Sequence, residues 1–308
     1  MQKRWLSDVI LEPLKTRSLL RVQGQEAAPF LQGLITNDMN NFERGSNSIY
    51  TLFLNTAGRV LYDSLIHQIP NKREDFLVEC DTSVVEQLRK HLNLFRVRKK
   101  VEISKLDWNI WVAFTQTGDG HSLIESTKSD ESDVFIFKDI RLQDLGCRII
   151  TSNNSTTDRL KSLFPKETSY ANNITYEQHR YILGIGEGIR NLPQGKCFPL
   201  ESNCDYLNGV SFNKGCYIGQ ELTARTHHTG VVRKRLMPLI FEQNVTADEL
   251  PDDAEIKSEG GQIVGKLRGC NMTFGLGLLR VEKVLASRAL IVDDKYHCTT
   301  YKPKWWPD

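Results

Sequence analysis

A β-hairpin early in the chain limits the folds that are open to it. Two segments with strand-like composition, Ile49–Asn55 and Val60–Gln68, are separated by the turn sequence Ala57-Gly58-Arg59, and this arrangement predicts antiparallel pairing. Apolar residues at helical spacing predict a helix over Glu26–Ile35. Antiparallel hairpins interspersed with single helices indicate an α+β fold and not a doubly wound parallel sheet.

Two further helices follow from the same periodicity. Val84–Phe95 carries apolar residues on one face, and Ser83 with Glu86 matches a capping box at its start. Tyr176–Leu183 has a helical pattern that we expect to end at Gly184.

The residue composition of the sequence changes after residue 232. Short β-rich segments separated by glycine and proline follow, and they predict a small β barrel or sandwich. These segments are Leu239–Glu242, Gly261–Leu267, Gly275–Val281 and Ala289–Val292. Because 308 residues exceed a typical single domain, we predict two domains, residues 1–232 and 233–308.

Charge and cysteine usage exclude several classes of protein. The formal net charge of +2 at pH 7 is too balanced to make nucleic acid or an anionic membrane an obligatory partner, so any basic site must be local. Seven widely spaced cysteines without a C-x-x-C pair fit neither a disulfide framework nor a zinc site, and favour a reducing compartment. No apolar run reaches the roughly 18 residues of a membrane span. We therefore predict no nucleic-acid partner, no membrane span and no stably bound metal.

Two features that suggest a ligand have simpler explanations. Gly184, Gly186 and Gly188 follow a helix instead of a strand, so turn glycines explain them better than a dinucleotide fingerprint does. His227 and His228 would point to opposite sides of an extended strand and lack cysteines or acids at matched spacing. Solvated or hydrogen-bonded histidines therefore explain them better than metal ligands.

The segment Lys214–Glu221, followed by Arg225, carries the strongest chemical signal. Two glycines bracket Cys216 and permit a close approach of the backbone to a ligand, or an exposed bend. Lys214 and Arg225 would favour the thiolate, so Cys216 is the best candidate for a reactive thiol. Residues 214–236 hold five basic residues against one acid, which would attract an anion. The alternative is an ordinary buried cysteine that acts as a small hydrophobe.

The same segment resembles the signature of the YgfZ-type family, folate-binding relatives of the glycine-cleavage T-protein whose mitochondrial members assist iron-sulfur cluster assembly. The match covers the eight consecutive residues Lys214–Glu221 and Arg225. Further blocks resemble the family over nearly the whole chain, and these are Val22–Asp38, Gly58–Asp63, Tyr181–Glu201 and Pro303–Pro307.

The resemblance implies both a fold and a ligand. The implied fold has two intertwined T-protein-like α+β lobes around a central channel, followed by a separate C-terminal β barrel. The implied ligand is tetrahydrofolate in the channel, with Cys216 near its mouth. A pterin needs directional hydrogen bonds and a glutamate tail needs cations. The candidate folate-binding residues are Asn37, Asp38, Asp63, Glu201, Tyr217, Gln220 and Glu221.

One departure from the T-protein pattern bears on catalysis. T-proteins carry two adjacent acids after the glycine turn, whereas this chain has Tyr62-Asp63. Aminomethyl transfer needs a placed carboxylate for proton transfer at the folate nitrogen, so the loss of one acid argues against T-protein catalysis. Whether the chain is an enzyme stays open. Asp63 either orders the pterin or forms a local salt bridge with Arg59.

By resemblance to the mitochondrial branch, the chain is expected to be an iron-sulfur cluster assembly factor of the mitochondrial matrix. Its implied partners are A-type scaffold proteins and [4Fe-4S] client enzymes such as aconitase. Clusters usually take four cysteine ligands, so Cys216 would act transiently, as one shared ligand or by reacting with a sulfur species. The N-terminal segment Met1–Arg17 is basic but contains Asp8 and Glu12, and signals targeting only weakly.

Two other functions remain as alternatives. One is a folate-dependent one-carbon transferase that moves an aminomethyl or methyl group and does not need Cys216. The other is a binding module that docks through Trp305 and Trp306, although terminal tryptophans more often pack against their own domain.

Overall fold

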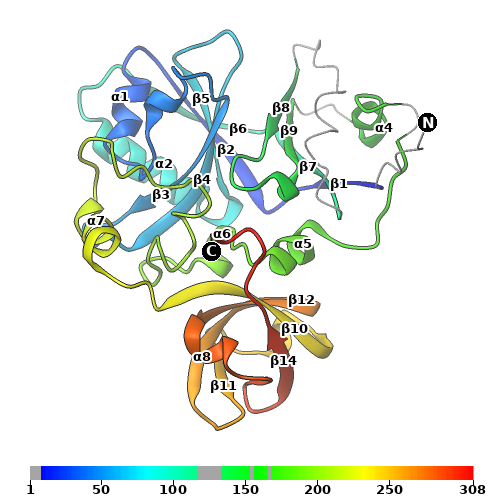
Figure 1. The fold of residues 1–308 in the computed structure, drawn as a ribbon. Coiled ribbons are helices and arrows are strands. Elements are labelled where there is room, and N and C mark those ends of the chain that lie inside the picture. The colour runs from blue at the N-terminus through cyan, green and yellow to red at the C-terminus, as the bar shows by residue number, and fades with distance from the viewer. Residues whose placement is uncertain (1–7, 117–132, 153–155, 166–167, 308) are drawn as a thin grey trace. The chain divides into compact units, whose positions relative to one another are not determined.

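The computed structural model describes residues 8–116, 133–152, 156–165 and 168–307, so residues 1–7 of the basic N-terminal segment lie outside the described part. The chain divides into two compact units, each described here by itself. The first comprises residues 1–51 and 64–176, and the second residues 52–63 and 177–308. Figure 1 shows the elements of both.

The first unit contains an antiparallel sheet in the order β3-β4-β5-β2-β6. The predicted hairpin strands are β3 and β4, which are neighbours in this sheet. The turn between them and the strand ends beside it, residues 52–63, belong to the second unit. The α+β prediction is therefore confirmed. The strands are β2 (Arg17–Gln23), β3 (Ser48–Leu54), β4 (Val60–Gln68), β5 (Asp75–Asp81) and β6 (Glu102–Leu106).

Helices connect these strands where the apolar spacing predicted them. They are α1 (Ala27–Gln32) and α2 (Val85–Arg96), with 3-10 turns at Met39–Asn41 and Thr82–Val84. Helix α2 buries Val85, Leu88 and Leu92. The predicted capping box is wrong, because the chain first makes a 3-10 turn whose N–H groups are capped by Asp81. The Asp81 carboxylate accepts hydrogen bonds from the Ser83 amide at 2.8 Å and from the Ser83 hydroxyl at 2.5 Å.

A second sheet of the first unit has the order β1-β7-β9-β8. Its strands are β1 (Val9–Pro13), β7 (Asn109–Thr115), β8 (Val134–Lys138) and β9 (Cys147–Thr151), accompanied by a 3-10 turn at Gln143–Leu145 and helix α4 (Thr157–Lys161). Buried charges connect the two sheets. Glu79 of β5 accepts hydrogen bonds from Arg17 at 2.8 Å and from Arg148 of β9 at 3.3 Å, and lies 3.5 Å from His67. Charges this deeply buried require partners, and here the partners of Glu79 come from both sheets.

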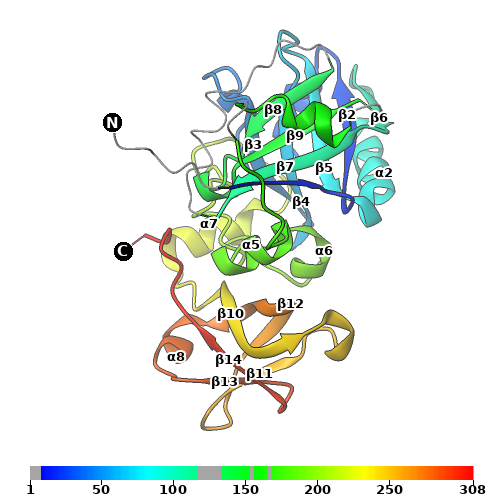
Figure 2. The same cartoon turned by 90° about the vertical axis from the view of Figure 1, so that its right-hand side faces the viewer.

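The second unit combines helices with a closed C-terminal barrel. Helix α5 (Tyr176–Leu183) ends at Gly184 as predicted, and α6 (Gly188–Asn191) and α7 (Gln220–Thr229) follow. The barrel order is β10-β12-β11-β13-β14, which confirms the predicted C-terminal barrel (Figure 2). Its elements are β10 (Lys234–Val245), a 3-10 turn at Ala247–Glu249, β11 (Glu255–Ser258), β12 (Ile263–Arg280), α8 (Val281–Leu285), β13 (Leu290–Val292) and β14 (Tyr296–Thr300).

Strand β12 corrects one prediction. The segments Gly261–Leu267 and Gly275–Val281 were expected as separate strands, but both belong to this 18-residue strand. Its first part pairs with β11 and its last part with β10. One long strand that changes partner along its length lets a five-stranded sheet close on itself.

The C-terminal tail packs against the second unit. Trp306 is only 7% exposed and belongs to the barrel core, where its ring lies 5.9 Å from that of Tyr206. The Trp305 indole nitrogen donates a hydrogen bond to the Leu183 carbonyl at 2.7 Å. The packing prediction for these tryptophans is confirmed, and the proposal that they form an exposed docking patch is wrong. In the described part of the chain, no helix is long and apolar enough to cross a membrane.

Candidate functional site

Two of the motifs singled out from the sequence pack against each other in the second unit. Gly219 adopts φ +79° at the N-terminus of α7, and Gly58 adopts φ +74° in the turn between β3 and β4. A Cβ atom on Gly219 would lie 2.3 Å from the Asn55 carbonyl oxygen and 3.2 Å from the Gly58 Cα. Only glycine fits such a contact in the left-handed region. The sequence predicted that the backbone at this glycine could closely approach a ligand, and in the structure it closely approaches the hairpin turn.

The contact leaves Cys216 at the surface, just before helix α7. Among the seven cysteines, all of which lie in the described residues, Cys216 alone is exposed. A Cβ atom on the preceding Gly215 would have no neighbour within 4 Å, so the segment forms an open bend. The prediction of an exposed thiol is confirmed, and the alternative of a buried cysteine is wrong. Its reactivity remains a prediction.

Several of the buried cysteines have a raised pKa. Burial raises the pKa of Cys147 and Cys298 to about 12, and that of Cys197 and Cys270 to about 11. A thiol must ionise to act as a nucleophile or a metal ligand, so these four are poorly suited to either role. Cys80 and Cys204 are also buried.

The polar neighbours of Cys216 interact with one another. The Lys214 ammonium lies 4.9 Å from the centre of the Tyr217 ring, and the Tyr217 amide donates to the Gln220 side chain at 3.0 Å. Arg225 pairs with Glu221 at 2.5 Å, one helical turn apart, and both side chains are exposed. An exposed pair of this kind contributes at most about 0.5 kcal/mol. Its salt bridge therefore leaves the Arg225 guanidinium available to an incoming anion.

Glu201, predicted to contact a pterin, lines a cavity of about 620 Å³ within the second unit. Helix α7 contributes three threonines to its lining, and the start of β10 and end of β12 contribute cations. The polar lining residues are Glu201, Thr223, Thr226, Thr229, Arg233, Lys234 and Arg280. This volume lies within the usual range for small-molecule sites, and a few convergent polar groups are typical of them.

Burial raises the pKa of the Glu201 carboxyl, and the nearby cations Lys234, Arg268 and Arg59 oppose that effect. A partly buried carboxyl of this kind either accepts hydrogen bonds as a carboxylate or donates one when protonated. The cavity thus offers one acidic group to a polar ring and several cations to an anionic tail.

Sequence reasoning missed part of this lining. Residues 227 and 228 were considered for an extended strand, but they belong to helix α7, where the His227 ring stacks on Phe212 at 3.5 Å. The strand assumption was wrong because the segment before 220 is a bend that starts the helix. The threonines of the Glu201 cavity were also not predicted. Their spacing at positions 223, 226 and 229 could have indicated a shared helical face, since residues three apart lie on the same side of a helix. Arg280 carried no local signal.

Asp63 lies at the end of the hairpin segment of the second unit and is buried. Its carboxylate accepts a hydrogen bond from the Gly188 amide at 3.0 Å. Arg59, its expected salt-bridge partner, instead lies over the Phe198 ring at 4.6 Å. Asp63 therefore has a structural contact with the α6 turn.

Asn37 and Asp38 belong to the first unit, in the turn before the 3-10 helix Met39–Asn41. The Asn37 amide group donates to the Tyr50 carbonyl at 2.7 Å. The Asp38 carboxylate accepts from the Asn40 amide at 3.0 Å and from the Gln32 side chain at 2.9 Å. These contacts hold the turn, and neither residue lines the Glu201 cavity. Tyr217, Gln220 and Glu221 do not line it either.

No cluster of three or more histidine, cysteine, aspartate or glutamate side chains suited to a metal ion occurs among the described residues.

Comparisons with known proteins identify relatives over most of the chain. The human protein called iron-sulfur cluster assembly factor IBA57, mitochondrial, is 36% identical over 96% of this chain and 84% of its own length, and the mouse protein of the same name is 37% identical over the same shares. The CAF17 C-terminal β-barrel domain model matches residues 233–308. Among solved structures, the glycine cleavage system aminomethyltransferase T of Bartonella henselae superposes with a TM-score of 0.72. It covers 97% of this chain and 87% of its own at 12% identity, and so shows a shared fold.

Proposed function

The chain belongs to the IBA57 family of mitochondrial iron-sulfur cluster assembly factors, and we propose that it acts in mitochondria in the maturation of [4Fe-4S] proteins. The observation that carries the mechanistic part of this proposal is the exposure of a single thiol, Cys216, among seven cysteines. A cluster usually takes four cysteine ligands. One thiol can therefore only share a cluster or a sulfur species with a second protein.

In this proposal Cys216 supplies one ligand, or one nucleophilic sulfur, at an interface with an A-type scaffold protein. Cys216 is exposed, and a Cβ atom on the neighbouring Gly215 would meet nothing within 4 Å, so the chain is open around this bend. Contact between Gly219 and Gly58 fixes the helix that follows. The thiol is thus presented from a rigid support, which lowers the entropic cost of forming a shared site.

We further propose that the Glu201 cavity binds a reduced folate. The fit rests on the lining, because Glu201 suits the hydrogen-bonding edge of a pterin while Arg233, Lys234 and Arg280 suit the carboxylates of a glutamate tail. When bound, the folate would supply either a structural element or a one-carbon or redox group. The residues of this chain would bind and orient it.

The alternative function, one-carbon transfer by the chain itself, requires a different catalytic group. Transfer needs a carboxylate able to exchange protons at the folate nitrogen. Tyr62 stands where the first acid of the T-protein pair would be, and Asp63 is buried and accepts a backbone hydrogen bond. Formation of methylene-tetrahydrofolate by the purified protein with an aminomethyl donor would support this alternative.

A complementation experiment tests the proposed role of the thiol. Cells depleted of the endogenous protein receive wild type, C216S or the matched control N213S, which alters an exposed residue of the same bend. We expect C216S to fold normally, as judged by its melting temperature, but to fail to restore aconitase activity, whereas N213S restores it. Full rescue by C216S would refute the assignment.

Folate binding is tested separately by calorimetry with tetrahydrofolate. We expect E201Q and R280Q to weaken binding at least about tenfold, since each removes a charge-assisted hydrogen bond. Absence of binding by the wild-type protein would refute the folate proposal without affecting the role of Cys216.

A further inference from the structure

The first unit carries an exposed cluster that mixes apolar and basic residues, and the proposed function does not use it. It lies where helix α2 ends and the loop to β6 begins. The apolar members Leu94, Phe95 and Val97 are 74%, 38% and 79% exposed. Scattered single exposed apolar residues need no explanation, but three within four positions do.

Basic residues surround these apolar side chains in the sequence. The stretch from Gln87 to Val101 contains six lysines and arginines and no acid. Of these, Lys90, Arg98, Lys99 and Lys100 are exposed. Among the described residues, the six make two ion pairs, a close one of 2.9 Å from Arg89 to Glu86 and a long one of 3.9 Å from Lys99 to Glu26. The overall charge of the chain is nearly neutral, so this is a local concentration of positive charge.

The backbone of the loop holds this arrangement in place. Val97, the residue after α2, adopts φ +47°, a backbone conformation that β-branched residues rarely adopt. The Lys100 amide donates to the Glu26 carboxylate at 2.7 Å, and the Val101 amide to the Lys99 carbonyl at 2.9 Å. An unfavourable backbone conformation at an exposed apolar residue such as Val97 suggests that the residue contributes to binding.

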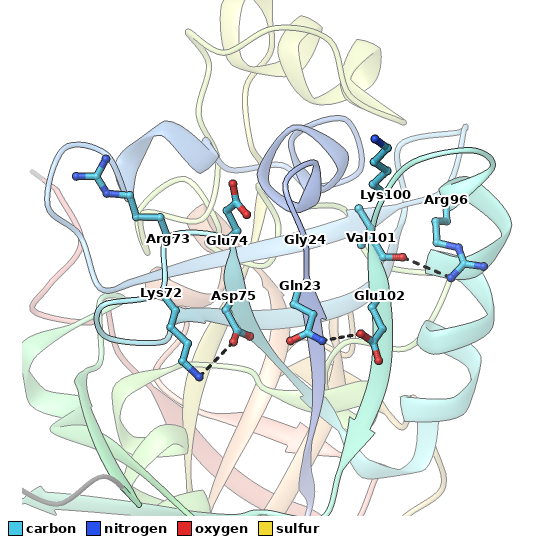
Figure 3. A pocket seen from close by; sticks show the side chains of 10 residues that line it. All are labelled: Gln23, Gly24, Lys72, Arg73, Glu74, Asp75, Arg96, Lys100, Val101 and Glu102. Carbon is cyan, nitrogen blue, oxygen red and sulfur yellow. Dashed lines mark hydrogen bonds and ion pairs between the residues drawn. The ribbon is translucent and has the colours of Figure 1, made fainter.

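A cavity of about 720 Å³ lies beside the loop, at the end of the sheet where β2 ends and β5 and β6 begin. Figure 3 shows Arg73, Glu74 and Lys100 extending beyond the strand ends. Two acids of the lining have partners along the strands: Asp75 with Arg21 at 2.5 Å, and Glu102 with Gln23 at 2.6 Å. Its cations are Arg73, Arg96, Lys100 and Lys72, of which Lys72 lies 4.0 Å from Asp75, and Glu74 is the remaining acid.

We propose that this end of the first unit, formed by Leu94–Lys100 and the adjoining cavity, binds peripherally to an anionic phospholipid bilayer. Leu94, Phe95 and Val97 would enter the headgroup region, while the cations contact lipid phosphates. Interfacial segments of this kind combine a few apolar side chains with lysine and arginine. A protein partner fits less well, because protein interfaces are depleted in lysine and need a larger patch.

Vesicle co-sedimentation of the full chain tests the proposal. The probes are vesicles of phosphatidylcholine alone and of phosphatidylcholine mixed with phosphatidylglycerol. We expect binding only to the mixed vesicles, and its loss when ionic strength rises from about 0.1 M to about 1 M, where the screening length falls to about 3 Å. Each surface cation contributes about 1 kcal/mol, or about fivefold, so R98E/K99E should weaken binding by at least about 25-fold. L94S/V97S should also weaken binding to the mixed vesicles, because it removes two of the apolar side chains that would enter the headgroup region.

Matched controls change comparable residues elsewhere. K302E/K304E reverses two positive charges in the exposed C-terminal segment, and L285S removes an exposed leucine at the end of α8. Both should bind like the wild type, and melting temperatures should confirm that every variant folds. The proposal is overturned if wild type binds both vesicle types equally or not at all, or if the controls weaken binding as much as the loop variants. It is also overturned if R98E/K99E abolishes binding to single-stranded RNA or an acidic peptide while vesicles are not bound.

Discussion

Gly219 packs directly against Gly58, although the two belong to motifs far apart in the sequence. A side chain on Gly219 would collide with the hairpin turn, since its Cβ atom would lie 3.2 Å from the Gly58 Cα and 2.3 Å from the Asn55 carbonyl oxygen. The contact connects the turn between β3 and β4 to the start of helix α7. It thereby fixes one end of the bend that presents Cys216 and one wall of the Glu201 cavity.

Replacing Gly219 by alanine should therefore destabilise the protein. The left-handed backbone costs an L-residue about 1–2 kcal/mol, and the collision adds to it, so we expect a loss of at least about 2 kcal/mol in the free energy of unfolding. Urea denaturation measures this. The control is G215A, where a Cβ atom meets nothing within 4 Å and the change should stay within about 0.5 kcal/mol. Equal losses for the two variants would contradict the assignment.

Alkylation should distinguish Cys216 from the other thiols. In the folded protein, iodoacetamide should modify Cys216 alone, because the other six cysteines are buried and thiolates are the reacting species. Mass spectrometry should find one adduct on the native wild type, none on native C216S, and seven on the unfolded wild type. A second adduct on the native wild type would show that another thiol is accessible.

Stability should decrease in mildly acidic solution, with His67 as a main cause. Burial lowers the pKa of His67, and its contact with Glu79 opposes this only in part. Below about pH 6.5 this histidine takes up a proton in the unfolded chain but not in the folded chain. Protonation therefore favours the unfolded state, so the free energy of unfolding is highest above that pH and decreases as the pH falls. Burial lowers the pKa of His91 too, and adds to the effect.

We expect the melting temperature to fall between about pH 7.5 and about pH 5.5, and to fall less in H67Q than in wild type. The comparison uses the difference between the two pH values, so a general destabilisation of H67Q does not affect it. An identical pH dependence of the two proteins would exclude His67 as a cause.

Trp306 should stabilise the barrel through its buried ring, over which the Arg235 guanidinium lies at 5.8 Å, and without a hydrogen bond from its indole nitrogen. Its ring is buried, but its indole nitrogen has no hydrogen-bond partner among the described residues. W306A should cost about 3–5 kcal/mol by leaving a cavity, whereas W306F should cost much less because it keeps most of the buried ring. Thermal denaturation of both variants checks this. A loss for W306F as large as that for W306A would indicate a role for the indole nitrogen.

Much of the fold followed from local patterns. Strands β3 and β4 and helix α5 lie close to the predicted ranges, because alternation and helical spacing are properties of short segments. Short strands with little apolar character, such as β14, were missed, and β12 was divided in two. Whether a segment continues as a strand depends on partners that are distant in sequence, and in a closed barrel these partners decide it.

For the candidate site, the sequence alone selected Cys216 and Glu201, through glycine spacing and a family resemblance. Only the tertiary structure decided that Cys216 is the single exposed thiol, that Glu201 shares a cavity with Arg280, and that Asp63 binds the backbone of Gly188. Residue type and spacing determine what chemistry a side chain is capable of. Its exposure, its charged neighbours and its hydrogen-bond partners come from segments brought together by folding, which is why no local pattern contained them.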